Sequence, residues 1–531
     1  MGFERFKPGS SQLWIKHYRY PVAFFLCVIF SALIASPQAG FLTRLGSDFL
    51  IPHAASIAKT RTTDLPSSIA LVVIDEITHQ TPPFSETPEV AWTPYLGEII
   101  KAIEDAGAAV IGLDMIFPKT ISSRGLLPGY DRTFLQSLAS AGRQGKLVLT
   151  ETRLSETTIR PYTGQVIAVG GSDNIRPAHL TPDADNIIRR HPAFQPLENG
   201  EEVYTFAAEL SARVNALPSN AILIDFTTPV TNFPTYRFSD LYQCMQAGER
   251  HIFDRFANKV VLIGTALDIE DRHVAANRLQ KDKDFPILSL PCGDKSTTLN
   301  ELNRASTAGV FIEARAAYTF INNTAPTSPG WGATFLLTLF LLLVMATAFL
   351  RLNPIYGFAF LTAASAMLWF VSANVLANQT MLPFLPWLLS ISLLFILIYS
   401  YRVILEDQSK RWVTHAFRHY LNPELVRKLA DDPDALRLGG ERRRVVVLFA
   451  DLAGFTTTSE EMKDAPEELV AHLHSFFQII GENIELHHGY IDKFIGDAVM
   501  GVWGAPIEIS NPERSAIKAA IGCIKEINAW N

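Results

Sequence analysis

The chain has 531 residues, a net charge of −7, and a composition in which 48% of residues are hydrophobic and 19% are charged. The net negative charge argues against a nucleic-acid partner, and four cysteines are too few for a disulfide framework. The length predicts two or more domains. The high apolar content is typical of a chain with both membrane and globular parts.

Four apolar segments predict helices that cross a lipid bilayer, which takes about 20 residues of helix. The first covers 21–41 and follows a basic stretch at 1–20, and the others cover 331–350, 355–376 and 381–401. We interpret the first segment as an uncleaved anchor. Its basic start is long for a signal peptide, and the residues near its end make a poor cleavage site.

Lysine and arginine residues flank these segments on one side of the predicted membrane. Because basic flanks remain in the cytoplasm, we expect a cytoplasmic N-terminus, an extracytoplasmic region at 43–330 and a cytoplasmic region after about 401. The chain is therefore predicted to cross a membrane several times.

The region 43–330 alternates strand-like and helix-like segments, which predicts an α/β domain with helices covering a sheet. Residues 275–308 are polar and irregular, and they predict a loop insertion. The expected strands cover 69–75, 109–117, 221–226 and 259–264, and the expected helices cover 94–108, 201–216 and 309–323.

Several polar residues of this region allow two interpretations. Asp75, Asp114, Asp268 and Asp271 lie at or beyond strand ends, where α/β sheets bind ligands, but we favour turn and helix-cap roles. Cys244 and Cys292 could pair in an oxidising compartment; we expect them not to pair.

Four motifs, "LVVIDE", "VIGLDMIF", "FANKVVLIGTALDIEDRH" and "GVFIEARAAYTFI", occur in this order between one predicted span and three more. In sequence and layout the region resembles the second class of CHASE sensor domains of bacterial signalling proteins. The resemblance implies that residues 43–330 sense an extracytoplasmic ligand, which the sequence does not identify.

The cytoplasmic part begins with a connector at 402–440, which we interpret as a helix broken at Asn422-Pro423. Residues 445–451 predict a strand buried on both faces. They are followed by a helix at 466–488, a hairpin whose two-residue turn is Gly496-Asp497, and a helix at 512–530. This order predicts an incomplete ferredoxin-like α+β domain over 441–531.

Two aspartates of this domain can converge, since Asp451 ends the first strand and Asp497 lies in the hairpin turn. Adjacent carboxylates repel unless a cation lies between them, and Mg²⁺ binds carboxylates together with substrate phosphates. We therefore expect a two-metal phosphoryl-transfer site. Alternation along the strand would place Lys493 between Ile491 and Ile495 on one apolar face.

Two motifs, "GGERRRVVVLFADLAGFT" and "GYIDKFIGDAVMGVWGAP", resemble the signatures of class III nucleotidyl cyclases. The resemblance implies that Asp451, Asp497 and the carbonyl of Leu452 bind two Mg²⁺ (or Mn²⁺) ions. It also implies that the amides around Gly454, Phe455 and Thr456 hold a triphosphate. Lys493 matches the base-selecting position and implies ATP, which would be converted into cyclic AMP and pyrophosphate. Asp492, His487 and His488 are assigned surface roles.

In this family the remaining transition-state residues follow the second helix, beyond the last residue of this sequence. We therefore expect a truncated domain that is nearly inactive unless a homodimer or a longer cyclase chain completes its site. The alternative is a non-catalytic receptor whose shortened domain only dimerises or binds a partner. The Gly-Gly-Asp-Glu-Phe signature of cyclases that condense two GTP molecules is absent from the sequence.

Overall fold

The computed structural model of the chain describes residues 10–61, 67–122, 125–154, 157–196, 200–269, 271–280, 286–293, 306–417, 442–505 and 508–530. The chain divides into two compact units between Ile398 and Tyr399. The first unit holds an α/β domain and most of the apolar helices, and the second holds a smaller α+β domain.

A seven-stranded sheet forms the centre of the α/β domain, in the order β10-β1-β11-β2-β3-β4, with β5 also pairing with β3. All its pairs are parallel except β3–β4. The strands are β1 (Ile69–Ile74), β2 (Val110–Asp114), β3 (Leu147–Leu154), β4 (Thr157–Ile159), β5 (Ile175–Pro177), β10 (Thr235–Arg237) and β11 (Val260–Thr265).

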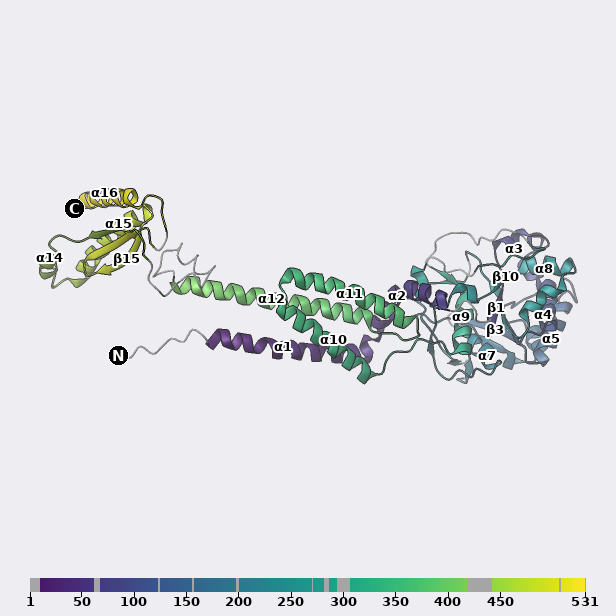
Figure 1. The fold of residues 1–531 in the computed structure, drawn as a ribbon. Coiled ribbons are helices and arrows are strands. Elements are labelled where there is room, and N and C mark those ends of the chain that lie inside the picture. The colour runs from purple at the N-terminus through teal and green to yellow at the C-terminus, as the bar shows by residue number, and fades with distance from the viewer. Residues whose placement is uncertain are drawn as a thin grey trace. The chain divides into compact units, whose positions relative to one another are not determined.

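Helices cover both faces of this sheet (Figure 1). On one face lie α4 (Thr93–Asp105), α5 (Arg132–Arg143) and α8 (Phe238–Gln246), and on the other lie α7 (Phe206–Ala212) and α9 (Gly309–Asn322). Strand β1 is buried along its whole length because its alternating apolar side chains enter the two cores in turn. The predicted α/β architecture is confirmed.

Smaller elements complete the domain. They are α3 (Glu76–Gln80), α6 (Thr163–Val169), and the strand pairs β6 (Arg190–His191) with β9 (Ile222–Leu223), β7 (Phe194–Pro196) with β8 (Glu202–Tyr204), and β12 (Arg272–His273) with β13 (Thr307–Ala308).

Two expected elements of this domain differ in the structure. The helix expected over 201–216 begins only at Phe206, because Glu202–Tyr204 pair with Phe194–Pro196 as strands. The strand expected over 221–226 is limited to Ile222–Leu223, which pairs with β6 and not with the main sheet. The expected loop insertion at 275–308 lies partly outside the described residues.

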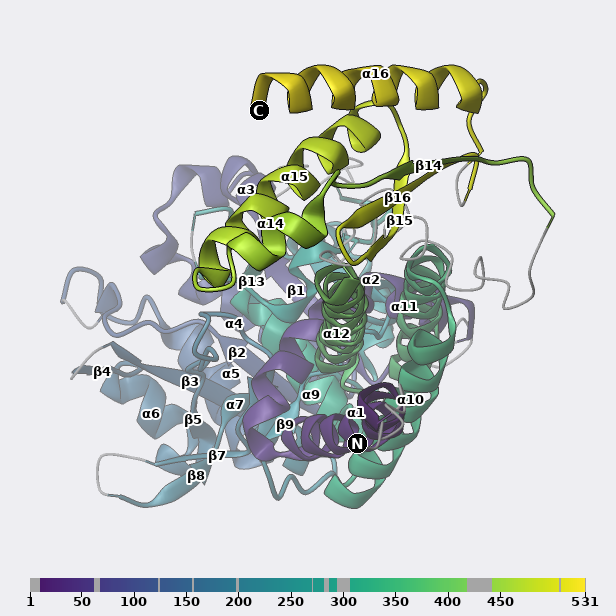
Figure 2. The same cartoon turned by 90° about the vertical axis from the view of Figure 1, so that its left-hand side faces the viewer.

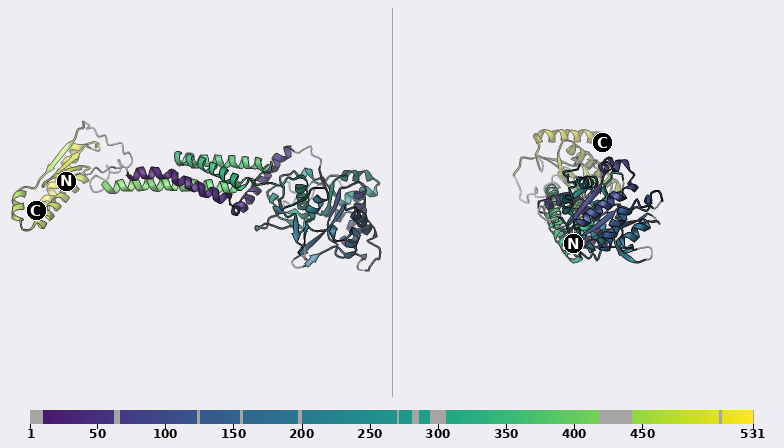
Figure 3. Two further views of the ribbon diagram at one scale, coloured as in Figure 1. Left: turned by 90° about the horizontal axis from the view of Figure 1, so that it is seen from below. Right: turned by 90° about the vertical axis from the view of Figure 1, so that its right-hand side faces the viewer.

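Among the residues that the structure describes, three helices are long and apolar enough to cross a membrane. They are α10 (Trp331–Arg351), α11 (Pro354–Leu376) and the Phe384–Val403 part of α12 (Phe384–Phe417). Trp387 of α12 donates a hydrogen bond to Thr338 of α10 at 2.8 Å, and Phe395 packs against Phe349. Figure 1 shows α1 (Ser10–Ala35) beside α10, which it contacts, and Figure 3 shows the same helices from below.

The first predicted span differs from a single helix. Helix α1 ends at Ala35, a turn follows at Pro37–Ala39, and α2 (Gly40–Arg61) leaves at a bend of 68°. The expected span 21–41 therefore crosses this bend, and the expected domain boundary at 43 falls inside α2. Counted as one broken span, the pair would bring the number of candidate spans to four.

The second unit contains a three-stranded antiparallel sheet in the order β14-β16-β15. Figure 2 shows α15 and α16 on one side of it. Its elements are β14 (Val446–Ala450), α14 (Phe455–Glu461), α15 (Pro466–Leu486), β15 (Tyr490–Ile495), β16 (Ala498–Trp503) and α16 (Pro512–Trp530). The predicted hairpin is confirmed, since β15 pairs with β16. Most of the expected connector at 402–440 lies outside the described residues, which exclude 418–441.

The prediction that β14 is buried on both faces is wrong for the described residues. Helices α15 and α16 pack on one face only, against Leu448 and Ala450 among others. The alternate side chains point to the open face, where Phe449 is 63% exposed. Strand β16, whose Val499 and Trp503 are buried, is the central strand instead.

Candidate active site

Asp451 follows the last residue of β14. The preceding residue, Ala450, pairs with Val499 of β16, so Asp451 leaves the sheet beside the start of β16. It is exposed to solvent. Antiparallel pairing therefore places Asp451 beside the β15–β16 turn, whose Asp497 lies two residues before Val499.

Asp497 lies in that turn. Ile495 pairs with Ala498, which leaves Gly496 and Asp497 as a two-residue turn. Gly496 has φ +66°, a backbone conformation that favours glycine over residues with a side chain. Asp497 is half-buried. The register thus brings Asp451 and Asp497, 46 positions apart in the chain, to the same edge of one sheet.

A short loop joins Asp451 to α14. Gly454 has φ +80° and immediately precedes α14, and the amide of Phe455 donates a hydrogen bond to the carbonyl of Leu452 at 3.4 Å. The side chain of Leu452 packs against the core beneath the sheet. Thr456 lies in the first turn of α14. Gly454, Phe455 and Thr456 therefore lie together in the segment that follows Asp451.

The donors at this edge suit a hard divalent cation, since carboxylates and a backbone carbonyl are the oxygen ligands that Mg²⁺ binds. Within the described ranges, no group of three or more histidine, cysteine, aspartate or glutamate side chains is arranged to hold a metal. An ion bound by the two aspartates would therefore take its remaining ligands from the backbone, water or substrate.

The face expected for Lys493 is corrected by the structure. A β-bulge falls between Ile491, which pairs with Gly501, and Lys493, which pairs with Met500. The bulge adds one residue to β15 and reverses the alternation. Ile491 consequently packs against the helix-covered core, whereas Lys493 lies on the open face with its side chain 59% exposed.

The bulge also changes the surroundings of the lysine. The ammonium of Lys493 forms an ion pair with Asp492 at 3.1 Å, although strict alternation would have placed these side chains on opposite faces. The expected surface role of His487 is incomplete, because its backbone carbonyl accepts a hydrogen bond from the indole of Trp503 at 3.0 Å. His488 takes the left-handed turn conformation at the end of α15.

The family model described as "CHASE2 domain" matches residues 26–348, more than half of the chain. The chain belongs to the CHASE2-domain family. A second model, described as "Adenylate and Guanylate cyclase catalytic domain", matches residues 440–529. The chain thus joins a CHASE2 domain to a class III cyclase catalytic domain, as the motifs predicted.

Similar curated proteins match the cyclase part. "Adenylate cyclase 1" of Rhizobium meliloti (strain 1021) is 33% identical over 115 residues, which are 22% of this chain and 17% of that protein. An uncharacterised protein of Mycobacterium tuberculosis (strain ATCC 25618 / H37Rv) is 37% identical over 91 residues, 17% of this chain and 16% of that protein. The chain therefore spans about a sixth of the length of these relatives.

In the CHASE2 domain, the cap role favoured for Asp75 agrees with the structure. Its carboxylate accepts hydrogen bonds from the backbone amide of Thr78 at 2.9 Å and from Nε of Arg237 at 2.8 Å. Oδ1 of Asp268 lies 3.6 Å from Nη1 of Arg272, and Oδ1 of Asp271 lies 3.0 Å from Nε2 of His273.

Asp114 differs from these aspartates. It ends β2 within reach of the charges of Glu313 and Asp271. Burial, and then these two charges, raise the pKa of its carboxyl well above the usual value.

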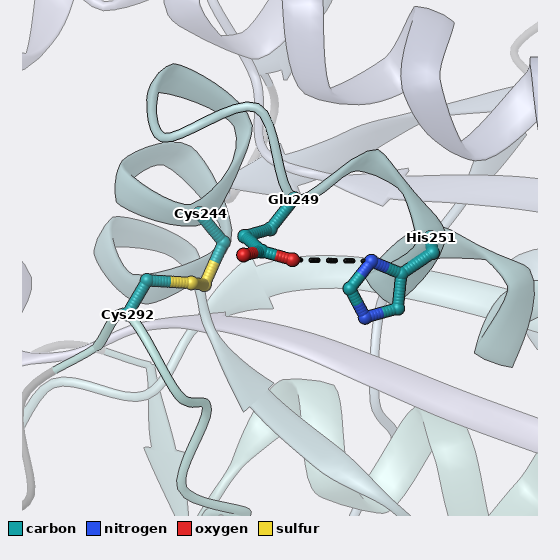
Figure 4. The surroundings of a disulfide bond; sticks show 4 residues. All are labelled: Cys244, Glu249, His251 and Cys292. Carbon is teal, nitrogen blue, oxygen red and sulfur yellow. Dashed lines mark ion pairs between the residues drawn. A yellow bond between two sulfur atoms is a disulfide. The ribbon is translucent and has the colours of Figure 1, made fainter.

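The expectation about the cysteines of the CHASE2 domain is wrong. Cys244 of α8 and Cys292 form a disulfide with their Cα atoms 5.1 Å apart (Figure 4). Glu249 and His251 form an exposed ion pair nearby. The sequence carries no signal for this pairing, since 48 residues separate the cysteines and only the fold brings them together.

Proposed function

We propose that this chain is a membrane-bound adenylate cyclase that converts ATP into cyclic AMP and pyrophosphate under the control of its CHASE2 domain. The observation that carries the proposal is the register of β14 and β16, which brings Asp451 beside the turn that holds Asp497. The strand order β14-β16-β15 supports a ferredoxin-like arrangement of the domain. The similarity to a protein named adenylate cyclase adds support for the substrate.

In this proposal Asp451, Asp497 and the carbonyl of Leu452 hold two Mg²⁺ or Mn²⁺ ions. When bound, the ions would neutralise charge on the triphosphate and would lower the pKa of the attacking hydroxyl. The amides of Gly454, Phe455 and Thr456 would hold the triphosphate by hydrogen bonds, and for this the amide of Phe455 would exchange its 3.4 Å contact with the carbonyl of Leu452 for a phosphate oxygen. The ribose 3′-oxygen then forms a bond to the α-phosphorus, the bond to the bridging oxygen breaks, pyrophosphate leaves, and the hydroxyl proton passes to solvent.

Lys493 selects adenine by donating a hydrogen bond to a ring nitrogen. Its ammonium has three donors, and the ion pair with Asp492 occupies it in the structure. Base binding therefore requires the ammonium to turn away from Asp492 or to share its donors. The open-face position of Lys493 supports this role, because the helix-covered face is filled by the core.

The proposed topology places residues 43–330 outside a bacterial inner membrane, with the N-terminus and the cyclase domain in the cytoplasm. The disulfide of Cys244 and Cys292 supports it, since disulfides persist in oxidising compartments. The proposed catalytic assembly is a homodimer or a pair with a longer cyclase chain, each contributing residues to the site.

The test is cyclic AMP synthesis by the full chain in membranes, alone and co-expressed with a longer cyclase chain whose own metal-binding aspartates are replaced by alanine. We expect synthesis in the mixed assembly. Because charge stabilisation of the transition state is lost, D451N and D497N should each lower the rate by at least about 100-fold. The matched control D464N, which changes an exposed aspartate of the same domain, should leave the rate unchanged.

The alternative, a non-catalytic receptor, predicts a different result. This chain and the longer cyclase chain would both accumulate in the membrane. Their mixed assembly would nevertheless make no more cyclic AMP than the assembly that contains the D497N variant. That result would overturn the proposed activity while leaving the CHASE2 domain in place.

A further inference from the structure

A cavity of about 320 Å³ lies in the first unit at the bend between α1 and α2. Its walls come from both sides of this bend, from the β6–β9 pair, from the start of α10 and from the residues just before α12. The volume is within the range of ligand pockets, roughly 300–1,000 Å³. The cavity therefore lies where the CHASE2 domain meets the candidate membrane helices.

Two arginines give the cavity its charge. Arg44 of α2 and Arg190 of β6 are the only charged side chains among the described residues that line it. The side chain of Arg44 is 24% exposed and that of Arg190 is 52% exposed. Both guanidinium groups therefore offer surface that a bound molecule can touch.

Each arginine keeps donors that no other described residue occupies. The carboxylate of Asp183 accepts hydrogen bonds from Nε and Nη2 of Arg190, which leaves Nη1 without a hydrogen-bond partner within the described ranges. Arg44 approaches the same carboxylate only through Nε, at 3.4 Å and without a hydrogen bond, so its two Nη atoms remain available in the described part of the chain. Guanidinium N–H groups of this kind bind phosphate oxygens well.

The ion pairs around the cavity leave an excess of positive charge. Asp183 is buried and faces three guanidinium groups, since Arg189 also lies 3.2 Å from it. The connected network contains four arginines and three aspartates, so one positive charge is not balanced within it. Its members are Arg44, Arg189, Arg190 and Arg278 with Asp48, Asp183 and Asp185.

A tryptophan places the cavity at the boundary of the membrane. Trp331 lies in the first turn of α10, lines the cavity and is 64% exposed. Tryptophan is enriched at membrane–water interfaces, where its apolar ring and its N–H group both find partners. Below this level the two helices expose apolar side chains, including Leu33 of α1 and Leu336 of α10. The site thus combines unbalanced positive charge with an adjoining apolar surface.

We propose that this cavity binds the headgroup of an anionic phospholipid such as phosphatidylglycerol. Arg44 and Arg190 take the phosphate through their Nη atoms, and the indole N–H of Trp331 takes another headgroup oxygen. The acyl chains lie along the exposed apolar side chains of α1 and α10. This apolar surface favours a lipid over a free phosphate ion, which would use only the two arginines.

The position of the headgroup has a structural consequence. It touches the α1–α2 bend, the β6–β9 pair and the start of α10 together, because all three line the cavity. A bound lipid therefore stabilises the bend and holds the domain against α10. Any resulting effect on cyclic AMP synthesis rests on the proposed function, whereas the binding itself does not.

The test is hydrogen–deuterium exchange of the full chain in an uncharged detergent at constant ionic strength. Three probes are titrated separately, namely phosphatidylglycerol, the zwitterionic phosphatidylcholine and inorganic phosphate. The readout is the protection of peptides that cover the α1–α2 bend and the start of α10. We expect saturable protection by phosphatidylglycerol at concentrations at least about tenfold lower than for either other probe, the effect of one charge-assisted contact.

Three variants locate the site. R190Q and R44Q should each raise the half-saturating concentration of phosphatidylglycerol by about tenfold, because each loses a charge-assisted contact with the phosphate. The matched control R143Q removes an exposed arginine of α5, away from the cavity, and should change nothing. Pulse proteolysis in urea checks the fold of each variant, and we expect R190Q to remain folded because its side chain is half exposed.

Three results would overturn the proposal. The first is the absence of protection by phosphatidylglycerol. The second is equal protection by inorganic phosphate or phosphatidylcholine at the same concentrations, which would identify a free-anion site or unspecific lipid contact. The third is unchanged binding in both R190Q and R44Q. Since no readout depends on cyclic AMP, failure here is separable from failure of the proposed activity.

Discussion

The attachment of α2 to the CHASE2 domain depends on a buried carboxylate. Asp48 is fully buried and accepts hydrogen bonds from Nε and Nη2 of Arg189 at 3.0 and 2.7 Å, and it also pairs with Arg278. The Arg189 side chain is only 2% exposed. We predict that D48A destabilises the domain by about 3–5 kcal/mol, because removing one partner leaves the other charge buried without full compensation.

The same arginine offers a matched control. Asp185 also binds Arg189 through two oxygens, at 2.8 and 2.7 Å, but its side chain is 22% exposed. Water can replace this partner, so we expect D185A to cost about 1 kcal/mol or less.

The assay is urea-dependent pulse proteolysis of the full chain in detergent, which follows cleavage within the CHASE2 domain and gives the free energy of unfolding. Hydrogen exchange of α2 should rise in D48A and stay near the unaltered level in D185A. Equal losses of stability in the two variants, or a larger loss in D185A, would refute the reasoning from burial.

Three further predictions concern both units. Folding raises the pKa of Asp114, so its contribution to stability is present at acid pH and is lost as the pH rises through that raised pKa. D114N should therefore flatten the decline of the unfolding free energy between acid and neutral pH. The exposed control D254N should leave that decline unchanged. C244S should lower the stability of the CHASE2 domain by about 4 kcal/mol, as expected for a disulfide with a separation of 48 residues, and reductant should then have no additional effect. G489A should destabilise the cyclase domain by about 1–3 kcal/mol in urea unfolding, because the added Cβ would lie 2.5 Å from the indole of Trp503. A G489A variant as stable as the unaltered chain would contradict this packing.

The parts of the fold that were predictable are those that depend on local patterns. The Gly496-Asp497 turn lies between two runs of strand-forming residues, and the structure has the hairpin there. The helix over 466–488 was readable from its apolar spacing, and Phe476, Ile480 and Ile484 are buried as that spacing requires. Such signals need no knowledge of distant residues.

The parts that were missed depend on the three-dimensional surroundings. Strict alternation predicted Lys493 on the same face as Ile491. The bulge between them arises from the pairing of β15 with β16, and the sequence of β15 alone does not indicate it. The apolar run at 21–41 did not reveal the bend at Pro37, since length and hydropathy do not specify direction. The disulfide partners were likewise brought together only by the packing of α8.

The central claim is that Asp451 and Asp497 together hold divalent ions that bind a nucleotide triphosphate. The most direct measurement is the titration of the full chain with a fluorescent ATP analogue in the presence and absence of Mn²⁺. We predict saturable binding that requires Mn²⁺, is lost in both D451N and D497N, and persists in D464N. Binding that is independent of Mn²⁺, or equal in all three variants, would contradict the claim.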